Sequence, residues 1–561
     1  MGAGGTEGDG TVGGTCVVAL DDRFYFPGEY KKADFSCNTQ FGLQCTAAAG
    51  QSGGPTYFLD AGAQALSAGD VRDFLASRLP DLLVLIPCGR YRDATYHLIE
   101  QAVRASSCRL AVVAGACLPD EPARLLDRLP LVDGVLLGHD PKPLAKVSRQ
   151  LATHRTGARA SATEIPGFAW RCADSSINVM RDVAAVGGLE ALPVALRDGL
   201  SAFLSVSESR SDRYTKWLLD SSVGCPRQCI YCRTPVISRR QGDARWYPKD
   251  GAALAAEMTE LAEKSGVREF RFQDDNFLMP SHEAIRRADT FAAALRSYSK
   301  PLSFQVMFHS SVVCEADQAA LDRTVRALRD VGLERVFLGV ESGDAETLSY
   351  FRKDATVETN EQAIRWLTDR GLLVISGSVV FHPRTTILQL EREHRFFRRI
   401  VASPLGAALA PLGSYAHIIP GSELESEILA RGLTTRSEAE FRPVDPVAAA
   451  ALTAMLRFRR HAFTHDWFVF TVKRDLVHWQ RLEGARPDVL SALEPALLDA
   501  STISVDASWK VIAASRDGHP TDLISRGGRE MFTRAEALTE AIAATPFALH
   551  WRANLYSAPT A

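Results

Sequence analysis

The first 150 residues alternate between short apolar runs and longer amphipathic stretches. The apolar runs predict strands at residues 15–20, 56–60, 81–86, 109–114 and 134–137, and the amphipathic stretches predict helices at residues 40–49, 68–78, 93–105 and 121–128. Strands that alternate with helices pair in parallel, and the helices cover both faces of the sheet. The fold class is therefore α/β. Residues 1–150 are predicted to form a doubly wound, Rossmann-like domain whose ligand crevice lies at the carboxyl ends of its strands.

A second alternating region extends over residues 214–425. Strands are predicted at residues 217–221, 268–273, 303–307, 335–340, 373–380 and either 406–410 or 414–418, with helices at residues 252–264, 283–298, 318–331, 360–370 and 384–398. This pattern predicts a partial (β/α)6 barrel, in which functional residues gather at the carboxyl ends of the strands. Residues 151–213 have little apolar periodicity and are predicted to be a linker.

Residues 426–561 are predicted to form a mostly helical C-terminal domain. We expect helices at residues 423–431 and 446–465, an apolar and aromatic stretch at residues 467–479, and a strand of a small hairpin at residues 505–514, where apolar residues partly alternate. His461, His465 and His478 are candidates for substrate contacts or a proton relay, or they are packed helix residues. Because this region carries no recognisable motif, we expect it to determine substrate specificity.

The composition is that of an ordinary globular protein, with 46% apolar and 23% charged residues. The 64 Lys and Arg residues against 67 Asp and Glu residues give a net charge of −3, which does not indicate binding to nucleic acid or to a charged membrane surface. The sequence shows neither a signal-peptide pattern nor an apolar run of spanning length, so we expect a cytoplasmic location. The eleven cysteines do not form a disulfide-framework pattern.

Three cysteines occur within eight residues, at Cys225, Cys229 and Cys232, with the spacing C-x3-C-x2-C. A loop with this spacing can place three thiolates around one face of a [4Fe–4S] cluster, which normally takes four cysteines. The next cysteine is Cys314, so one iron would stay open to a substrate or cofactor. The alternatives are chance and a structural zinc site, although zinc usually takes four ligands from two separated pairs.

The stretch from Gly224 to Cys232, with Tyr231 before the third cysteine, resembles the cluster loop of the radical S-adenosylmethionine (SAM) superfamily. The resemblance implies that the three cysteines hold three irons and that SAM chelates the fourth. It also implies SAM contacts from the DDNF and GVESG segments, which contain the candidate residues Asp274, Asp275, Glu341 and Ser342. Lys353 and Thr356 match a family pattern of weaker role, and His382 departs from the family's more common residue. The alternative for the two aspartates is a helix cap or a loop salt bridge.

The first domain resembles the cobalamin-binding domain of B12-dependent radical SAM enzymes in its position and in its PDLLVLI and DGVLLGHD segments. An IPG turn and a later LP segment in the linker add to the resemblance. The resemblance implies bound cobalamin, with Arg90, Arg92, Gly115 and Gly138 as candidate contacts. No Asp-x-His-x-x-Gly motif is present, so no histidine ligand to cobalt is expected. The alternative is a flavodoxin-like domain that binds another nucleotide or no ligand.

Together these resemblances imply a cobalamin-dependent radical SAM C-methyltransferase with a [4Fe–4S] cluster, SAM and cobalamin as cofactors. Its substrate would be a small molecule or an amino acid in specialised-metabolite biosynthesis, such as antibiotic biosynthesis. Its electron donor would be a protein such as flavodoxin or ferredoxin. Two alternatives stay open: a B12-dependent radical SAM enzyme that rearranges or cyclises its substrate without net methylation, and a non-catalytic corrinoid or iron–sulfur sensing module.

Overall fold

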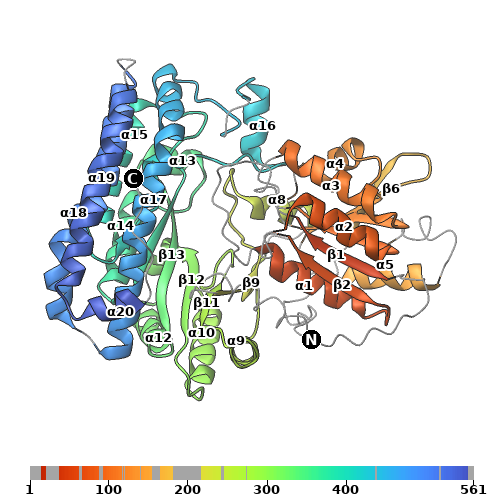
Figure 1. Ribbon diagram of the computed structural model, residues 1–561, viewed down its shortest axis with the longest axis horizontal. Coiled ribbons are helices and arrows are strands. Elements are labelled where there is room, and N and C mark those ends of the chain that lie inside the picture. Colours follow the sequence, from red (N-terminus) through yellow and green to blue (C-terminus); the bar gives the residue numbers. More distant parts are fainter. Residues whose placement is uncertain are drawn as a thin grey trace. The chain divides into compact units, whose positions relative to one another are not determined.

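The computed structural model describes residues 14–553 except residues 21–36, 62–65, 88–91, 116–117, 119, 139, 154–164, 181–215, 242–244, 273, 436–438, 485 and 517–519. The chain forms two compact units, the first comprising Met1–Leu218 with Val236–Arg245 and the second comprising Leu219–Pro235 with Trp246–Ala561 (Figure 1). None of the described helices is both long enough and apolar enough to cross a membrane.

The first unit contains a seven-stranded sheet with the strand order β2-β1-β3-β4-β5-β6-β7. Strands β1 to β5 pair in parallel, whereas β6 pairs antiparallel with β5 and with β7. The strands are β1 (Thr15–Ala19), β2 (Thr56–Asp60), β3 (Leu82–Ile86), β4 (Leu110–Val113), β5 (Gly134–Leu136), β6 (Phe168–Arg171) and β7 (Ile177–Met180). The central parallel strands are almost entirely Val, Leu and Ile, as expected where helices cover both faces.

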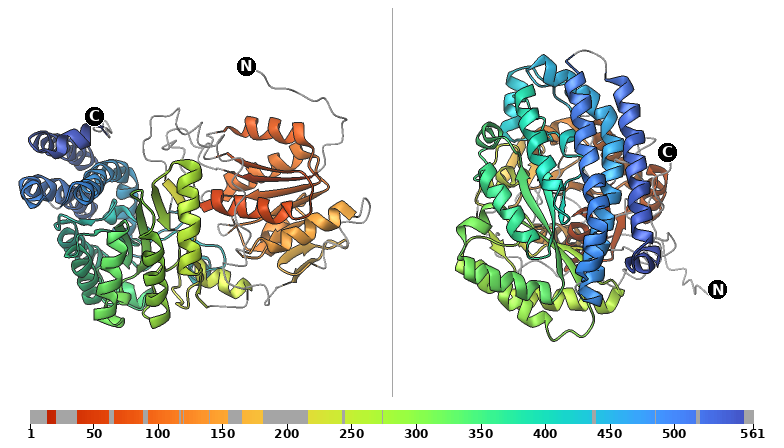
Figure 2. Two further views of the ribbon diagram at one scale, coloured as in Figure 1. Left: turned by 90° about the horizontal axis from the view of Figure 1, so that it is seen from below. Right: turned by 90° about the vertical axis from the view of Figure 1, so that its left-hand side faces the viewer.

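Helices pack on the two faces of this sheet (Figure 2). On one face, Leu144 shares a core with Val84, and on the other face Leu75 and Leu125 share a core with Leu85. The helices are α1 (Cys37–Gly50), α2 (Ala68–Arg78), α3 (Arg92–Ser106), α4 (Pro122–Arg128) and α5 (Lys142–Thr153). The predicted doubly wound fold is therefore confirmed.

The second unit contains a six-stranded sheet with the order β15-β14-β13-β12-β11-β8. The neighbouring pairs from β11 to β15 are parallel, as predicted for a partial barrel. The strands are β8 (Lys216–Leu219), β11 (Glu269–Phe272), β12 (Ser303–His309), β13 (Leu333–Glu341), β14 (Leu373–Ser378) and β15 (Gly406–Ala407), with β9 (Ser222–Val223) and β10 (Tyr247–Pro248) forming a separate antiparallel pair. Tyr415, in the alternative last strand, forms only an isolated bridge with Phe381.

The helices of the barrel connect its parallel strands. They are α9 (Gly251–Ser265), α10 (His282–Leu295), α11 (Ser311–Glu315), α12 (Gln318–Asp330), α13 (Ala345–Tyr350), α14 (Val357–Thr368) and α15 (Ile387–Val401). Helix α8 (Arg233–Gln241) begins in the second unit and continues in the first. The core between α10 and the sheet contains edge-to-face pairs of Phe272, Phe291 and Phe304. Side chains at alternate positions of β11 and β12 therefore pack outward against the helices, and the others face the inside of the barrel.

The C-terminal part of the second unit is helical. After α16 (Glu423–Ala430) come α17 (Pro446–Glu483), α18 (Pro487–Ala514), α19 (Thr521–Ala543) and α20 (Phe547–Ala553). The long helices lie side by side (Figure 2), and their shared core includes Leu476, Leu493 and Leu538. Phe470 and Val477 of α17 also pack on the inward-facing side chains of β14 and β15. Helix α17 thus covers part of the inner face of the sheet at β14 and β15.

Two predictions from the sequence were wrong. Residues 505–514 are the last turns of α18 and not a strand, because the buried side chains of Val505, Ser508, Val511 and Ile512 recur at helical spacing. The predicted linker also contains β6 and β7, which extend the first sheet. These strands are only four residues long, too short for a readable alternation, and Trp170 of β6 is fully buried.

Candidate functional site

The three-cysteine loop follows β9 and ends where α8 begins. Cys225, Cys229 and Cys232 are free thiols. Burial raises the pKa of Cys225 and of Cys229; the charge of Cys232 raises both further, and the charge of Cys225 adds to the shift of Cys229. The loop therefore brings all three sulfurs close enough to interact electrostatically.

The surroundings of these sulfurs fit a [4Fe–4S] cluster. The Asn276 side-chain amide donates a hydrogen bond to Cys225 Sγ at 3.2 Å, and the Thr234 backbone N–H donates to Cys232 Sγ at 3.5 Å. Such donors stabilise thiolate ligands. Among the described residues, no group of three or more His, Cys, Asp and Glu side chains converges on a single ion position. The hydrogen bonds to Cys225 and Cys232 are what fits these thiols to a [4Fe–4S] cluster.

Asp274 and Asp275, predicted as SAM contacts, both fasten the segment that carries the cysteines. The backbone N–H groups of Ser221 and Ser222 donate to Asp274 at 2.5 and 3.1 Å. Burial raises the pKa of Asp274 to about 6, although nearby Arg287 and these hydrogen bonds favour its carboxylate form. Contact of either aspartate with SAM stays a prediction, whereas their contacts within the chain give both a positioning role.

Asp275 reaches the two ends of the cysteine loop. One of its oxygens accepts a hydrogen bond from the Gly224 backbone N–H at 3.1 Å, and the other accepts from the Thr234 hydroxyl at 2.8 Å. Gly224 precedes the first cysteine and Thr234 follows the third by two residues. A single carboxylate therefore ties together the entry and the exit of the loop.

Glu341 ends β13, and its carboxylate forms an ion pair with Lys353 at 3.0 Å. Its φ of +65° lies in the left-handed region, which is unfavourable for a residue other than glycine and is found mainly at functional sites. Tyr231 of the cysteine loop interacts with the Glu341 carboxylate, and its ring packs on Phe351 at 4.7 Å. The predicted SAM contact Glu341 thus lies beside the cysteine loop.

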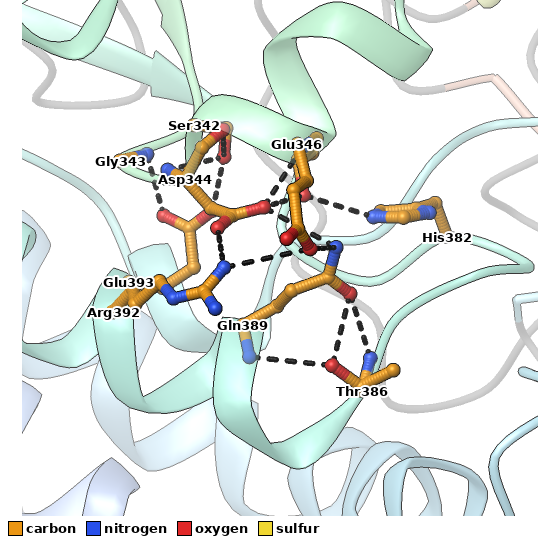
Figure 3. Close-up of polar contacts among 10 residues, drawn as sticks. Ser342, Gly343, Asp344, Glu346, His382, Thr386, Gln389, Arg392 and Glu393 are labelled. Carbon is orange, nitrogen blue, oxygen red and sulfur yellow. Dashed lines mark hydrogen bonds and ion pairs between the residues drawn. The ribbon is translucent and has the colours of Figure 1, made fainter.

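Ser342 is fully buried, and its hydroxyl donates a hydrogen bond to Glu393 of α15 (Figure 3). The Gly343 backbone N–H donates to the other oxygen of Glu393 at 2.8 Å. Burial raises the pKa of Glu393 to about 8 in spite of both hydrogen bonds. Ser342 therefore anchors the turn after β13 to α15, and its predicted contact with SAM stays a prediction.

The same turn is held by Asp344, which the sequence did not single out. Its carboxylate pairs with Arg392 at 2.5 Å and accepts from the Gln389 side chain at 3.2 Å (Figure 3). His382, after β14, contacts the Thr347 hydroxyl at 3.3 Å, and burial lowers the pKa of His382 to about 3. From the sequence, Asp344 could be recognised only as a possible helix cap, because Arg392, its ion-pair partner, lies far along the chain.

A further cluster contains Arg227 of the cysteine loop and His309 at the end of β12. Arg227 pairs with Asp354 at 2.5 Å and donates to the Ser311 hydroxyl at 2.6 Å. The Ser311 backbone N–H donates in turn to His309 Nδ1 at 3.1 Å. These contacts join the loop to the segment after β12 and to the segment between α13 and α14. Neither residue was predicted, because Arg227 is at a variable position of the cysteine motif and His309 belongs to no motif.

Residues 219–396 match the Radical SAM superfamily. These residues therefore form a radical SAM domain. Its curated relatives include an uncharacterized methyltransferase of Pyrococcus horikoshii, which is 19% identical over 69% of this chain and 78% of the relative. Another is the anaerobic magnesium-protoporphyrin IX monomethyl ester cyclase of Synechocystis, which is 24% identical over 57% of this chain and 59% of the relative.

Solved structures resemble this chain well beyond the radical SAM domain. The cobalamin-dependent SAM radical enzyme OxsB, with aqua-cobalamin and SAM bound, superposes with a TM-score of 0.67 at 13% identity, covering 94% of this chain and 80% of OxsB. The radical SAM methyltransferase TsrM from Kitasatospora setae, with tryptophan and a SAM analog bound, gives a TM-score of 0.56 at 16% identity and covers 76% of this chain and 77% of TsrM. These likenesses confirm the predicted fold class.

Only some of the predicted cobalamin contacts lie among the described residues of the first unit. Gly115 and Gly138 follow β4 and β5 with φ of +133° and +100°, values that strongly favour glycine. Arg90 lies outside the described residues, and Arg92 begins α3. The strand order reverses between β1 and β3, and such sheets bind ligands at that point, beyond the carboxyl ends of the strands. The two glycines lie at the carboxyl ends of β4 and β5, and their contact with cobalamin stays a prediction.

Proposed function

We propose that this radical SAM protein is a cobalamin-dependent methyltransferase. It would move a methyl group from SAM, with cobalamin as carrier, to a carbon of a small molecule or amino acid in specialised metabolism. The observation that carries the proposal is a three-cysteine loop in a radical SAM barrel that follows a doubly wound domain, an order shared with cobalamin-bound OxsB over 94% of this chain. Relatives named as methyltransferases or methylases, including the hopanoid C-2 methylase of Rhodopseudomonas palustris, support methyl transfer.

The chain's own residues have defined tasks in this proposal. When bound, the cluster with SAM supplies radical chemistry and cobalamin supplies a transferable methyl group. Cys225, Cys229 and Cys232 would hold the cluster, and Asp275 keeps their loop in shape. The Glu341–Lys353 pair presents polar atoms to SAM at the carboxyl end of the barrel. An external reductant such as flavodoxin or ferredoxin would supply the electron.

The test is anaerobic reconstitution with iron and sulfide in the presence of hydroxocobalamin, followed by desalting and absorption spectra. We expect the wild-type protein to retain both cluster and corrinoid. The triple variant with Cys225, Cys229 and Cys232 changed to Ala should lose iron and SAM cleavage but keep the corrinoid, because the first unit is untouched. Cys314→Ala serves as the matched control and should behave as wild type. A protein that holds the cluster but no corrinoid would refute cobalamin-dependent methyl transfer.

A second candidate is a reaction without net methylation. It is favoured by the likeness to OxsB, a cobalamin-dependent SAM radical enzyme, and by the cyclase among the relatives. Product mass separates the two candidates, because methyl transfer adds about 14 Da to the substrate whereas rearrangement adds nothing.

A further inference from the structure

His309 brings a buried and unpaired N–H group to the carboxyl end of β12. Its side chain is 5% exposed, and Nε2 has no hydrogen-bond partner among the described residues. The Ser311 backbone N–H donates to Nδ1, so Nδ1 carries no proton and the neutral ring must carry its proton on Nε2. Buried polar groups are almost always paired in native proteins, so this donor requires an explanation.

The ring is neutral in the folded chain. Burial lowers the pKa of His309 well below its ordinary range, and the positive charges of Lys353 and Arg227 lower it further. The group is therefore a fixed N–H donor in cationic surroundings. Such surroundings favour an acceptor that carries negative charge or exposed oxygen lone pairs.

The direction of His309 follows from the register of the sheet. His309 is the pairing partner of Gly339 on the neighbouring strand β13, so their Cβ directions point to the same face. A Cβ atom on Gly339 would lie 3.0 Å from both the Glu341 carboxylate and the Lys353 ammonium group. His309 therefore points to the face on which the Glu341–Lys353 pair lies, and Ser311 links it to Arg227 of the cysteine loop.

We propose that His309 donates its Nε2–H hydrogen bond to an oxygen of SAM. The inference rests on the proposed function, because it takes SAM to bind between the cysteine loop and the end of β13. Two parts of SAM offer such oxygens, namely the carboxylate of the methionine half and the hydroxyls of the ribose. Either acceptor would satisfy the buried donor and make His309 a binding residue that no motif contains.

The test compares two substitutions of similar size in cluster-loaded protein without reductant. His309→Gln keeps an N–H donor near the Nε2 position. His309→Asn keeps an acceptor for the Ser311 N–H but ends before that position. We expect His309→Asn to weaken SAM binding about tenfold, because one hydrogen bond is lost. His309→Gln should weaken it at most about threefold, because that hydrogen bond is retained. Equilibrium dialysis with labelled SAM measures both.

Separate titrations with L-methionine and with 5′-deoxyadenosine locate the acceptor. If the carboxylate is the acceptor, His309→Asn should weaken only methionine binding, and if the ribose is the acceptor, it should weaken only 5′-deoxyadenosine binding. His465→Asn is the matched control, since His465 is buried in α17 and its Nε2 contacts the Ala500 carbonyl at 2.6 Å. It should leave SAM binding unchanged.

Two results would overturn the inference. In the first, His309→Asn binds SAM as tightly as wild type. In the second, the His309→Asn and His309→Gln variants lose the cluster equally, which would mean that His309 only stabilises the cysteine loop. Failure of the proposed function looks different, because wild-type protein with a full cluster would then not bind SAM at all.

Discussion

Removing the Asp275 carboxylate should loosen the cysteine loop before any SAM is bound. Asp275→Ala removes the hydrogen bonds from Gly224 and Thr234, which have lengths of 3.1 and 2.8 Å. Each hydrogen bond to a charged group contributes about 1.5–3 kcal/mol, so the loss of two is roughly 3–6 kcal/mol, or about a hundredfold or more in cluster retention. The negative charge of Asp275 has the opposite effect on cluster retention. Burial raises the pKa of Cys225 and Cys232, and this charge raises it further and so disfavours their thiolates.

Asp275→Asn separates these two effects. The amide can keep one accepted hydrogen bond and donate the other to the Thr234 hydroxyl, while the negative charge is gone. We therefore expect a loss of cluster retention of only about threefold to tenfold, far less than for Ala. The assay is the concentration of an iron chelator that removes half of the cluster, measured anaerobically without SAM.

The matched control is Asp250→Ala, which also removes two accepted backbone hydrogen bonds, of 2.9 and 3.0 Å, but at the start of α9. It should cost about 1 kcal/mol of stability and leave cluster retention unchanged. If Asp275→Ala retains the cluster as wild type does and loses only SAM affinity, the tether argument is wrong, and Asp275 acts directly on SAM.

Two further predictions concern pH and the packing of the second unit. Glu334 accepts a hydrogen bond from Arg481 at 2.6 Å and contacts His478 at 2.8 Å. These α17 partners outweigh burial and lower the pKa of Glu334 to about 2. The contribution of Glu334 to the free energy of unfolding is therefore complete above about pH 4.5 and is lost as pH falls toward 2. In urea unfolding of the second unit, Glu334→Gln should cost about 3 kcal/mol of stability at pH 7 and remove this acid dependence. The control Arg486→Ala, which breaks an exposed ion pair, should cost less than about 1 kcal/mol. Equal effects of the two substitutions would contradict the argument. The effect of pH through Glu393 has the opposite sign, because its pKa of about 8 is above the value in the unfolded chain. The contribution of Glu393 to stability is therefore complete below about pH 4.5 and is lost as pH rises through 8. Glu393→Gln mimics the protonated form and should flatten the fall in stability between about pH 5 and 9; an unchanged slope in the same unfolding assay would show that Glu393 is ionised in the folded chain.

The layered architecture was predictable because parallel strands covered on both faces must be continuous apolar runs. The run Leu82–Ile86 and the helix Ala68–Arg78 appear where the sequence places them. The start of that helix is fixed by a local capping box between Ser67 and Asp70, which leaves a readable signature. Where local chemistry determines an element, the sequence alone therefore suffices.

The C-terminal helices show where local reading fails. Residues 505–514 alternate over a few positions, and so short a window fits a strand and a buried helix equally well. Tertiary packing decides between them, since α18 packs against both α17 and α19 and buries Val505 and Ile512 on one helical face. The histidines of α17 follow the same logic: His465 is packed against the Ala500 carbonyl and His478 contacts Glu334.

The candidate site was only partly readable, for a reason that three neighbouring strands make clear. β11, β12 and β13 lie side by side, and each is followed or ended by one polar residue, namely Asp274, His309 and Glu341. The sequence identified the first and the third from motifs. It missed His309 because the predicted strand stopped at residue 307, two residues short of the observed end of β12. Since parallel strands bring their carboxyl ends to one edge, a polar residue just beyond any predicted barrel strand is a candidate even without a motif. His309 is thus a residue that topology places at the candidate site once the length of its strand is known.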